Sequence, residues 1–136
     1  FNQGFMTTEL LAAALLDMEL HNLTDTENLN VVAFEKETMD KLGLIPEIAP
    51  RYRATYFSHI IGGYAAGYYS YLWAEVLDTD AFEAFKEHGV FDKNTADSFR
   101  KNILEKGGTE DPMTLYRGFR GADPSLEPLL KNRGLK

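Results

Sequence analysis

The residues best suited to chemistry lie between positions 59 and 75, in the sequence HIIGGYAAGYYSYLWAE. This stretch holds one histidine, four tyrosines and three glycines in seventeen residues, a mixture that a plain core helix does not need. An imidazole and phenol hydroxyls are hydrogen-bond donors that can hold a substrate carbonyl or stabilise charge developing on its oxygen in a transition state. The stretch is therefore the leading candidate for a binding or catalytic site.

Three of the tyrosines, Tyr64, Tyr68 and Tyr71, are spaced at i, i+4 and i+7. This spacing would place their hydroxyls along one side if helical geometry extended back to Tyr64. Buried tyrosines usually pair their hydroxyls, so the row is either a satisfied polar core or a surface that grips a polar ligand. His59 is open to the same two interpretations, an ordinary core or surface histidine or a donor to substrate.

The glycines of this stretch, Gly62, Gly63 and Gly67, predict a flexible turn or loop at residues 58–67. Glycine allows a positive φ angle or a close approach between the backbone and a ligand. A loop of this kind can close after a substrate enters a cleft. From Tyr68 onward the chain is expected to be helical.

The elements that must position these residues are predicted to be helices as well. Apolar residues recur at three and four residues in most segments, and no pair of strands competes with them. We therefore expect an all-α fold with about six to seven helices. Besides the segment after Tyr68, helical patterns cover residues 7–21, 31–42, a segment beginning at 51, 81–87, 94–106, 112–119 and 124–130. Their predicted caps include Thr7 or Thr8, Asp80, Asn94, Asp111 and Asp123.

Length and composition restrict the function further. A chain of 136 residues with 44% hydrophobic residues is the size of one ordinary domain. The net charge of -7 and the scattered Lys and Arg argue against binding to nucleic acid. The longest apolar segment, Leu10 to Leu16, is too short to span a bilayer, so no membrane partner is expected. The absence of cysteine excludes thiolate ligands and disulfides.

A metal site made by this chain alone is not predicted. The three histidines, His21, His59 and His88, lie far apart, and none belongs to an H-E-x-x-H helix. The sequence also lacks a G-x-S-x-G elbow and a phosphate-binding glycine loop. Acyl-serine and nucleotide chemistry are therefore unsupported.

The run HIIGGYAAGYYSYLWAEVLDTDAFEAF resembles the signature near the carboxyl end of the thimet oligopeptidase and peptidyl-dipeptidase family of zinc metallopeptidases. It is most similar to the bacterial peptidyl-dipeptidase branch. FNQGFMTTELLAAALLDMELH and RYRATYFSHI precede the signature, and FRKNILEKGG and LLKNRGL follow it, in the family's order. The resemblance therefore covers nearly the whole chain.

The resemblance implies that the complete protein hydrolyses oligopeptides with a zinc-bound water and releases dipeptides from their C-terminus. It implies that His59 and Tyr71 donate hydrogen bonds to the scissile carbonyl and its tetrahedral oxyanion. The residues implied to bind the substrate are Tyr64, Tyr68, Gly62 and Gly63.

The family's H-E-x-x-H segment, with its zinc ligands and general base, is absent from residues 1–136. We therefore expect the chain to be a C-terminal helical fragment of a peptidase catalytic domain. Zn²⁺ is expected in the full-length enzyme, with ligands outside this chain, and none in the fragment. Without that ion the fragment should be inactive alone. It is also expected to self-associate through apolar surface that the whole enzyme buries.

Two alternatives remain open at this point. One is an endo-acting oligopeptidase of the same family, which differs only in where the peptide is cut. The other is a non-catalytic helical module in which the tyrosine row grips a partner helix or peptide.

Overall fold

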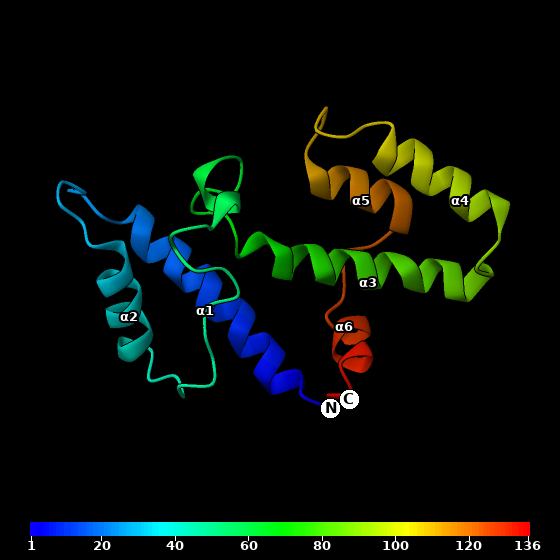
Figure 1. Ribbon diagram of the computed structural model, residues 1–136. Coiled ribbons are helices and arrows are strands. Elements are labelled where there is room, and N and C mark those ends of the chain that lie inside the picture. The colour runs from blue at the N-terminus through cyan, green and yellow to red at the C-terminus, as the bar shows by residue number, and fades with distance from the viewer. The chain divides into compact units, whose positions relative to one another are not determined.

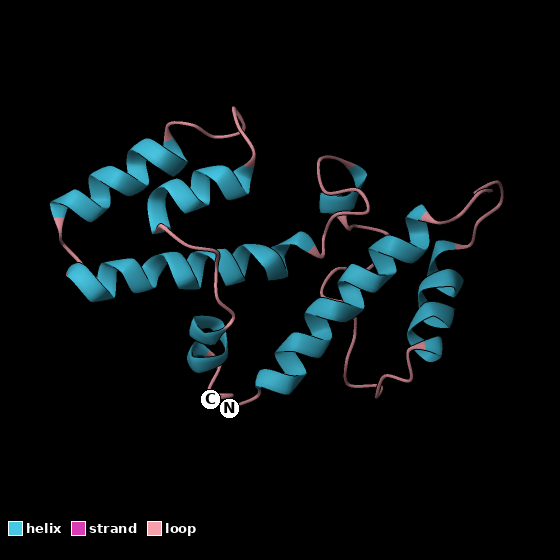
Figure 2. Cartoon of the chain, turned by 180° about the vertical axis from the view of Figure 1, so that it is seen from behind, coloured by secondary structure: helices cyan, strands magenta, loops and turns pink.

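The computed structural model describes residues 1–136 and contains helices and loops but no strands (Figure 2). The expected all-α class is confirmed. None of the helices is both long enough and apolar enough to cross a membrane. The elements are α1 (Gln3–His21), α2 (Val31–Lys41), the 3₁₀ helix η1 (Ser58–Ile61), α3 (Ser70–His88), α4 (Lys93–Phe99), the π-helical η2 (Arg100–Leu104), α5 (Pro112–Arg120) and α6 (Glu127–Asn132).

The chain divides into two compact units, Phe1–Tyr71 and Leu72–Lys136. In the first unit α1 packs against α2 (Figure 1). Small side chains on α1 let aromatic rings from later in the chain come close, and this contact forms the core of the unit. The buried residues of this core are Ala13, Ala14, Phe57, Ile60 and Tyr68.

Helix α1 begins earlier than the sequence indicates. The expected cap at Thr7 or Thr8 is wrong, because the Thr8 hydroxyl lies inside the helix and donates to the Gly4 carbonyl at 2.8 Å. Asn2, with φ of 58°, precedes the first turn and makes no side-chain cap bond. The predicted end of this helix at about His21 is confirmed.

The segment after Pro50 does not start a helix, and that prediction is wrong. Residues 51–57 form bends and turns. The cause lies on α2, where the buried Glu35 carboxylate accepts from the Ala54 backbone N–H at 2.7 Å and from the Arg53 side chain. A backbone donor held by a side chain is no longer available for a helical bond.

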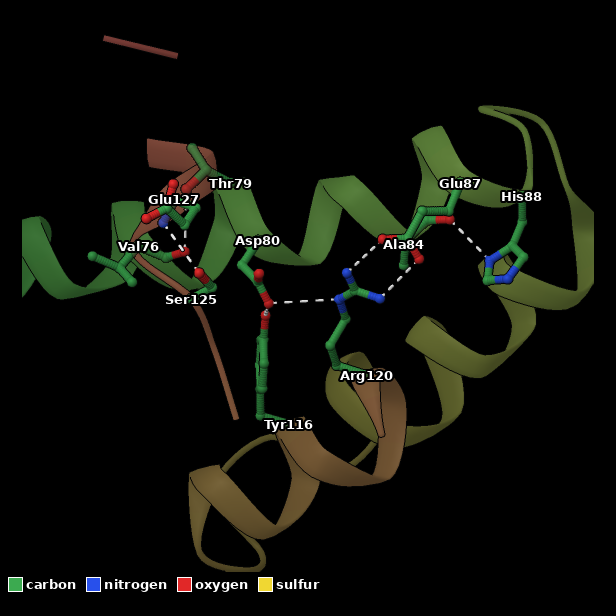
Figure 3. Close-up of polar contacts among 10 residues, drawn as sticks. All are labelled: Val76, Thr79, Asp80, Ala84, Glu87, His88, Tyr116, Arg120, Ser125 and Glu127. Atoms are coloured by element: carbon green, nitrogen blue, oxygen red, sulfur yellow. Dashed lines mark hydrogen bonds and ion pairs between the residues drawn. The ribbon is translucent and has the colours of Figure 1, made fainter. Parts of the chain in front are cut away.

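Helix α3 is continuous where the sequence predicted a break. Asp80 was expected to cap a short helix, but it lies in the middle of α3, with 4% of its surface exposed. Its carboxylate meets Tyr116 and Arg120 of α5 (Figure 3). The Thr79 hydroxyl donates to the Glu75 carbonyl one turn back, at 2.7 Å.

The predicted helix at 94–106 exists, but its cap is Asp92 and not Asn94. The Asp92 carboxylate accepts from the Thr95 N–H at 2.7 Å. Helix α4 then continues into the wider π-helical turn η2, which packs against α5. Asp111 caps α5 as predicted, accepting from the N–H of Thr114 at 3.0 Å.

The last helix begins later than predicted. Asp123 does not cap a helix at Pro124, because its carboxylate lies 2.5 Å from Arg117 Nε and is used in that ion pair. Helix α6 starts at Glu127 instead, with Pro128 in its first turn, where a missing N–H costs little.

Candidate functional site

The histidine and the three spaced tyrosines come together as one group of rings in the first unit. His59 lies on η1, Tyr64 and Tyr68 lie on the turns at 62–69, and Tyr71 lies in the first turn of α3. The centroids of the Tyr64 and Tyr71 rings are 5.0 Å apart in a stacked arrangement, and Tyr68 and Tyr71 are also 5.0 Å apart, edge to face. The tyrosines therefore meet through a chain of turns and not through the continuous helix that their spacing suggested.

The imidazole of His59 sits against these rings. Its centroid is 5.4 Å from that of Tyr68, 6.1 Å from Tyr71 and 4.7 Å from Tyr52. Its Nδ1 atom is buried and has no hydrogen-bond partner. Nε2 is therefore the nitrogen through which this side chain can meet a ligand.

Burial separates the tyrosines into two groups. Tyr64 and Tyr71 keep 43% and 36% of their surface exposed, whereas Tyr68 keeps 3%. Tyr68 is thus part of the core, as one of the two alternatives has it, whereas Tyr64 and Tyr71 lie at the surface. Tyr64 and Tyr71 form part of the surface, and the buried ring of Tyr68 packs against Tyr71.

The glycines give the loop room but not the expected backbone conformation. Gly62 has φ of -134°, and neither Gly62 nor Gly63 takes a positive φ. The positive angle falls on Ala66 instead, with φ of 51°. A side chain added at Gly62 or Gly63 would meet no atom within 4 Å, so the backbone there is open to an approaching ligand.

Electrostatics keep the phenols protonated. The hydrogen bond with Tyr64, burial and the neighbouring phenols raise the pKa of Tyr71 to about 12. Burial also raises the pKa of Tyr68, and the nearby Arg51 guanidinium offsets this in part. Both side chains are therefore neutral donors at physiological pH.

Two residues that position the site escaped the sequence analysis. Tyr52 stacks on Phe57 with the centroids 5.2 Å apart and covers one side of His59. Asp17 of α1 is fully buried and accepts backbone hydrogen bonds from the loop. The sequence did hold a signal for Asp17, which lies three residues after Ala14 and four after Ala13 and therefore on the same face of the helix. A carboxylate on the apolar face of a helix needs a partner, so this position indicates a buried polar contact.

The histidines do not form a metal site. His21 lies against Asp17, His59 lies among the rings, and His88 Nδ1 is 3.0 Å from the carbonyl of Ala84 (Figure 3). No three His, Asp or Glu side chains of this chain are grouped so that they could hold a metal ion. The side chains present therefore do not fit a zinc site of the chain's own.

The arrangement can bind a polar ligand. Exposed phenol hydroxyls and an imidazole border an open glycine backbone, and each of these groups can hydrogen-bond to a carbonyl oxygen or to an oxygen that gains negative charge. The fold and this site define an all-helical protein with neutral hydrogen-bond donors on the surface of its first unit.

The sequence model of peptidase family M3 matches residues 1–135, and the chain belongs to this family. The dipeptidyl carboxypeptidase of Escherichia coli (strain K12) is 45% identical over 142 residues, and that of Salmonella typhimurium is 44% identical over 138. Oligopeptidase A of Haemophilus influenzae is 40% identical over 137 residues. Each alignment covers 99% of this chain and 20% of the relative, so the chain spans about a fifth of the length of these relatives.

Proposed function

We propose that the protein containing this chain is a zinc metallopeptidase that hydrolyses oligopeptides, and that the chain supplies the groups that bind the substrate and the tetrahedral oxyanion. Membership of peptidase family M3 supports the reaction class. The names of the relatives, dipeptidyl carboxypeptidase and oligopeptidase A, support peptides as the substrate class.

His59 and Tyr71 are the proposed donors to the scissile carbonyl and its oxyanion. The observation that carries this proposal is the contact between their rings, with centroids 6.1 Å apart, while Tyr71 remains partly exposed. The contact brings the two side chains to one place in the first unit, where we propose that they donate to the same oxygen atom. A phenol with a pKa of about 12 keeps its proton at neutral pH and donates without ionising.

The remaining predicted residues have supporting roles in this proposal. Tyr64, exposed and stacked on Tyr71, holds the substrate backbone beside the reacting carbonyl. Gly62 and Gly63 leave room for that backbone to pass. Tyr68, which is buried, contributes as the ring on which His59 and Tyr71 rest.

We propose that the zinc ligands and the general base belong to residues outside these 136. The ion, when bound in the complete protein, supplies a water of lowered pKa as nucleophile. This chain contains no H-E-x-x-H sequence and no grouped set of ligands, which supports the proposal that it is inactive alone.

The proposed cleavage is release of dipeptides from the C-terminus, with endo-acting cleavage as the alternative, since relatives of both names align with 99% of the chain. Product analysis on an oligopeptide with a free and with an amidated C-terminus distinguishes them. Loss of cleavage on amidation supports dipeptide release, and equal cleavage of both peptides supports the alternative.

The test of the proposed site is Tyr71→Phe in the complete protein, with Tyr69→Phe as the matched control. Tyr69 lies on the same loop and is 49% exposed, but it has no ring contact with His59. Removal of one oxyanion donor costs about a hundredfold or more in kcat. Tyr71→Phe should show this loss with unchanged zinc content, while Tyr69→Phe keeps wild-type kcat. An unchanged kcat in Tyr71→Phe would remove this residue from the proposed role.

A further inference from the structure

The loop that carries the tyrosines is fastened to α1 by one buried carboxylate. Asp17 has no exposed surface. Its Oδ1 accepts from the Ala66 N–H at 2.9 Å, and its Oδ2 accepts from the Tyr68 N–H, also at 2.9 Å. A buried carboxylate that accepts backbone bonds from residues 49 and 51 positions away specifies where those residues lie.

A histidine one turn later completes the arrangement. His21 Nδ1 is 2.9 Å from Asp17 Oδ1 and 2.9 Å from the Asp17 carbonyl oxygen. Both neighbours are acceptors, so Nδ1 carries the proton and donates. His21 is thus one of three donors around Asp17, and its own side chain is 34% exposed.

We propose that Asp17, oriented by His21, is the positioning residue of this site and sets the placement of His59 and Tyr71 through the loop at 62–69. This inference rests on the proposed function. Asp17 itself lies in the core beneath the loop and acts through the backbone of Ala66 and Tyr68.

Two features of the loop make its placement depend on that carboxylate. Ala66 takes a left-handed φ of 51°, which a residue with a Cβ adopts only when its surroundings impose it. Tyr68 is in ring contact with both His59 and Tyr71, at 5.4 and 5.0 Å. A shift of the Tyr68 backbone would therefore move both proposed donors at once.

Only a carboxylate suits this position. Both of its oxygens accept, and each faces a backbone N–H. In Asp17→Asn one oxygen becomes an NH₂ group, so a donor would face either the Ala66 or the Tyr68 N–H. The substitution keeps the size of the side chain and removes one of the two anchors.

Glu35 provides the matched control. It is also a buried carboxylate of the first unit, 3% exposed, and it also accepts a backbone N–H, that of Ala54 at 2.7 Å. It makes no hydrogen bond with the loop at 62–69. Glu35→Gln thus causes the same chemical change at a carboxylate that holds residues 53 and 54 instead of residues 66 and 68.

The experiment compares Asp17→Asn and Glu35→Gln in the complete, zinc-loaded protein, by hydrogen exchange of peptides covering residues 62–69 and by steady-state kinetics. In Asp17→Asn the loop amides should exchange about tenfold faster, because a hydrogen bond to a charged group is lost. The kcat should fall about a hundredfold with a much smaller change in KM, as expected when reacting groups move by about 1 Å. Glu35→Gln should leave the exchange of the amides at 62–69 at its wild-type value, because Glu35 makes no hydrogen bond with them.

His21→Ala keeps the inference testable if Asp17→Asn does not fold. This variant removes one donor to Asp17 at a partly exposed site and should lower kcat severalfold, with faster exchange at 62–69. Unchanged exchange of the loop in the Asp17 or His21 variant would overturn the inference, as would faster exchange with wild-type kcat. Failure of the proposed function gives a different result, since Tyr71→Phe would then keep its kcat while the exchange of the loop still responds to Asp17.

Discussion

The hydroxyl of Tyr116 makes the best-defined prediction about stability. It donates to Asp80 Oδ2 at 2.5 Å, and both residues are at least nine-tenths buried (Figure 3). The other partner of this carboxylate, Arg120 Nε, is 3.6 Å away, beyond hydrogen-bond distance. In Tyr116→Phe, Asp80 would keep an ion pair but lose its hydrogen bond.

The expected cost follows from this geometry. A hydrogen bond to a buried charged group contributes about 1.5–3 kcal/mol to the free energy of unfolding. Because Asp80 keeps its ion pair with Arg120, we expect Tyr116→Phe to lower this free energy by about 2 kcal/mol. With a urea slope of about 2 kcal/mol per molar, the unfolding midpoint should fall by about 1 M. Tyr69→Phe is the control, because surface substitutions usually change stability by less than about 0.5 kcal/mol.

The assay is urea unfolding followed by far-ultraviolet circular dichroism, repeated across pH. Burial and the Asp80 carboxylate raise the pKa of Tyr116 above that of an unfolded tyrosine, about 10. Below pH 10 the tyrosine is protonated in both states, so its full contribution is present. Above pH 10 the unfolded state ionises first, and the difference between wild type and Tyr116→Phe should narrow. A difference below about 0.5 kcal/mol at pH 7, or one that widens above pH 10, would refute this account of the network.

Two further predictions concern the chain itself. Difference titration at 295 nm between wild type and Tyr71→Phe should show that Tyr71 ionises with a pKa near 12. Tyr64→Phe should lower the pKa of Tyr71 toward the ordinary tyrosine value, since the hydrogen bond with Tyr64 is the first cause of the raised pKa. A pKa of Tyr71 that is unchanged in Tyr64→Phe would contradict this. The isolated chain should show no chelator-sensitive turnover of a blocked peptide with added zinc, and clear turnover would count against this. Light scattering should detect self-association of the isolated chain, because residues such as Ile61 and Phe91 expose 82% and 99% of their surface. A strictly monomeric mass at high concentration would count against self-association.

Local signals in the sequence predicted the elements whose determinants are also local. Asp111 followed by Pro112 fixes the start of α5 because the cap and the first turn are adjacent in the chain. The apolar repeat from Leu10 onward likewise predicted α1 and its end near His21.

Two of the failures have the same physical cause, a side chain whose partner lies far away in the sequence. Asp80 has the sequence context of a cap, but Tyr116 of another helix satisfies it within α3. Residues 51–57 were expected to start a helix because no strand partner was found for them, but Glu35 takes the N–H of Ala54. Such partners are 36 and 19 residues apart, so no local pattern contains them.

The sequence predicted which rings come together at the candidate site, but it did not predict the backbone that brings them together. His59 and the spaced tyrosines do meet. The sequence could not indicate that Tyr68 faces the core while Tyr64 and Tyr71 face outward, because turns and not a helix bring the rings together.

The bonds from Asp17 to the loop also restrict how that loop can open. Residues 66 and 68 cannot leave α1 without removing the donors of a buried negative charge, whereas a Cβ added at Gly62 or Gly63 would contact no other atom. We therefore expect hydrogen exchange in the native state to be faster at residues 62 and 63 than at residues 66 and 68, which Asp17 holds.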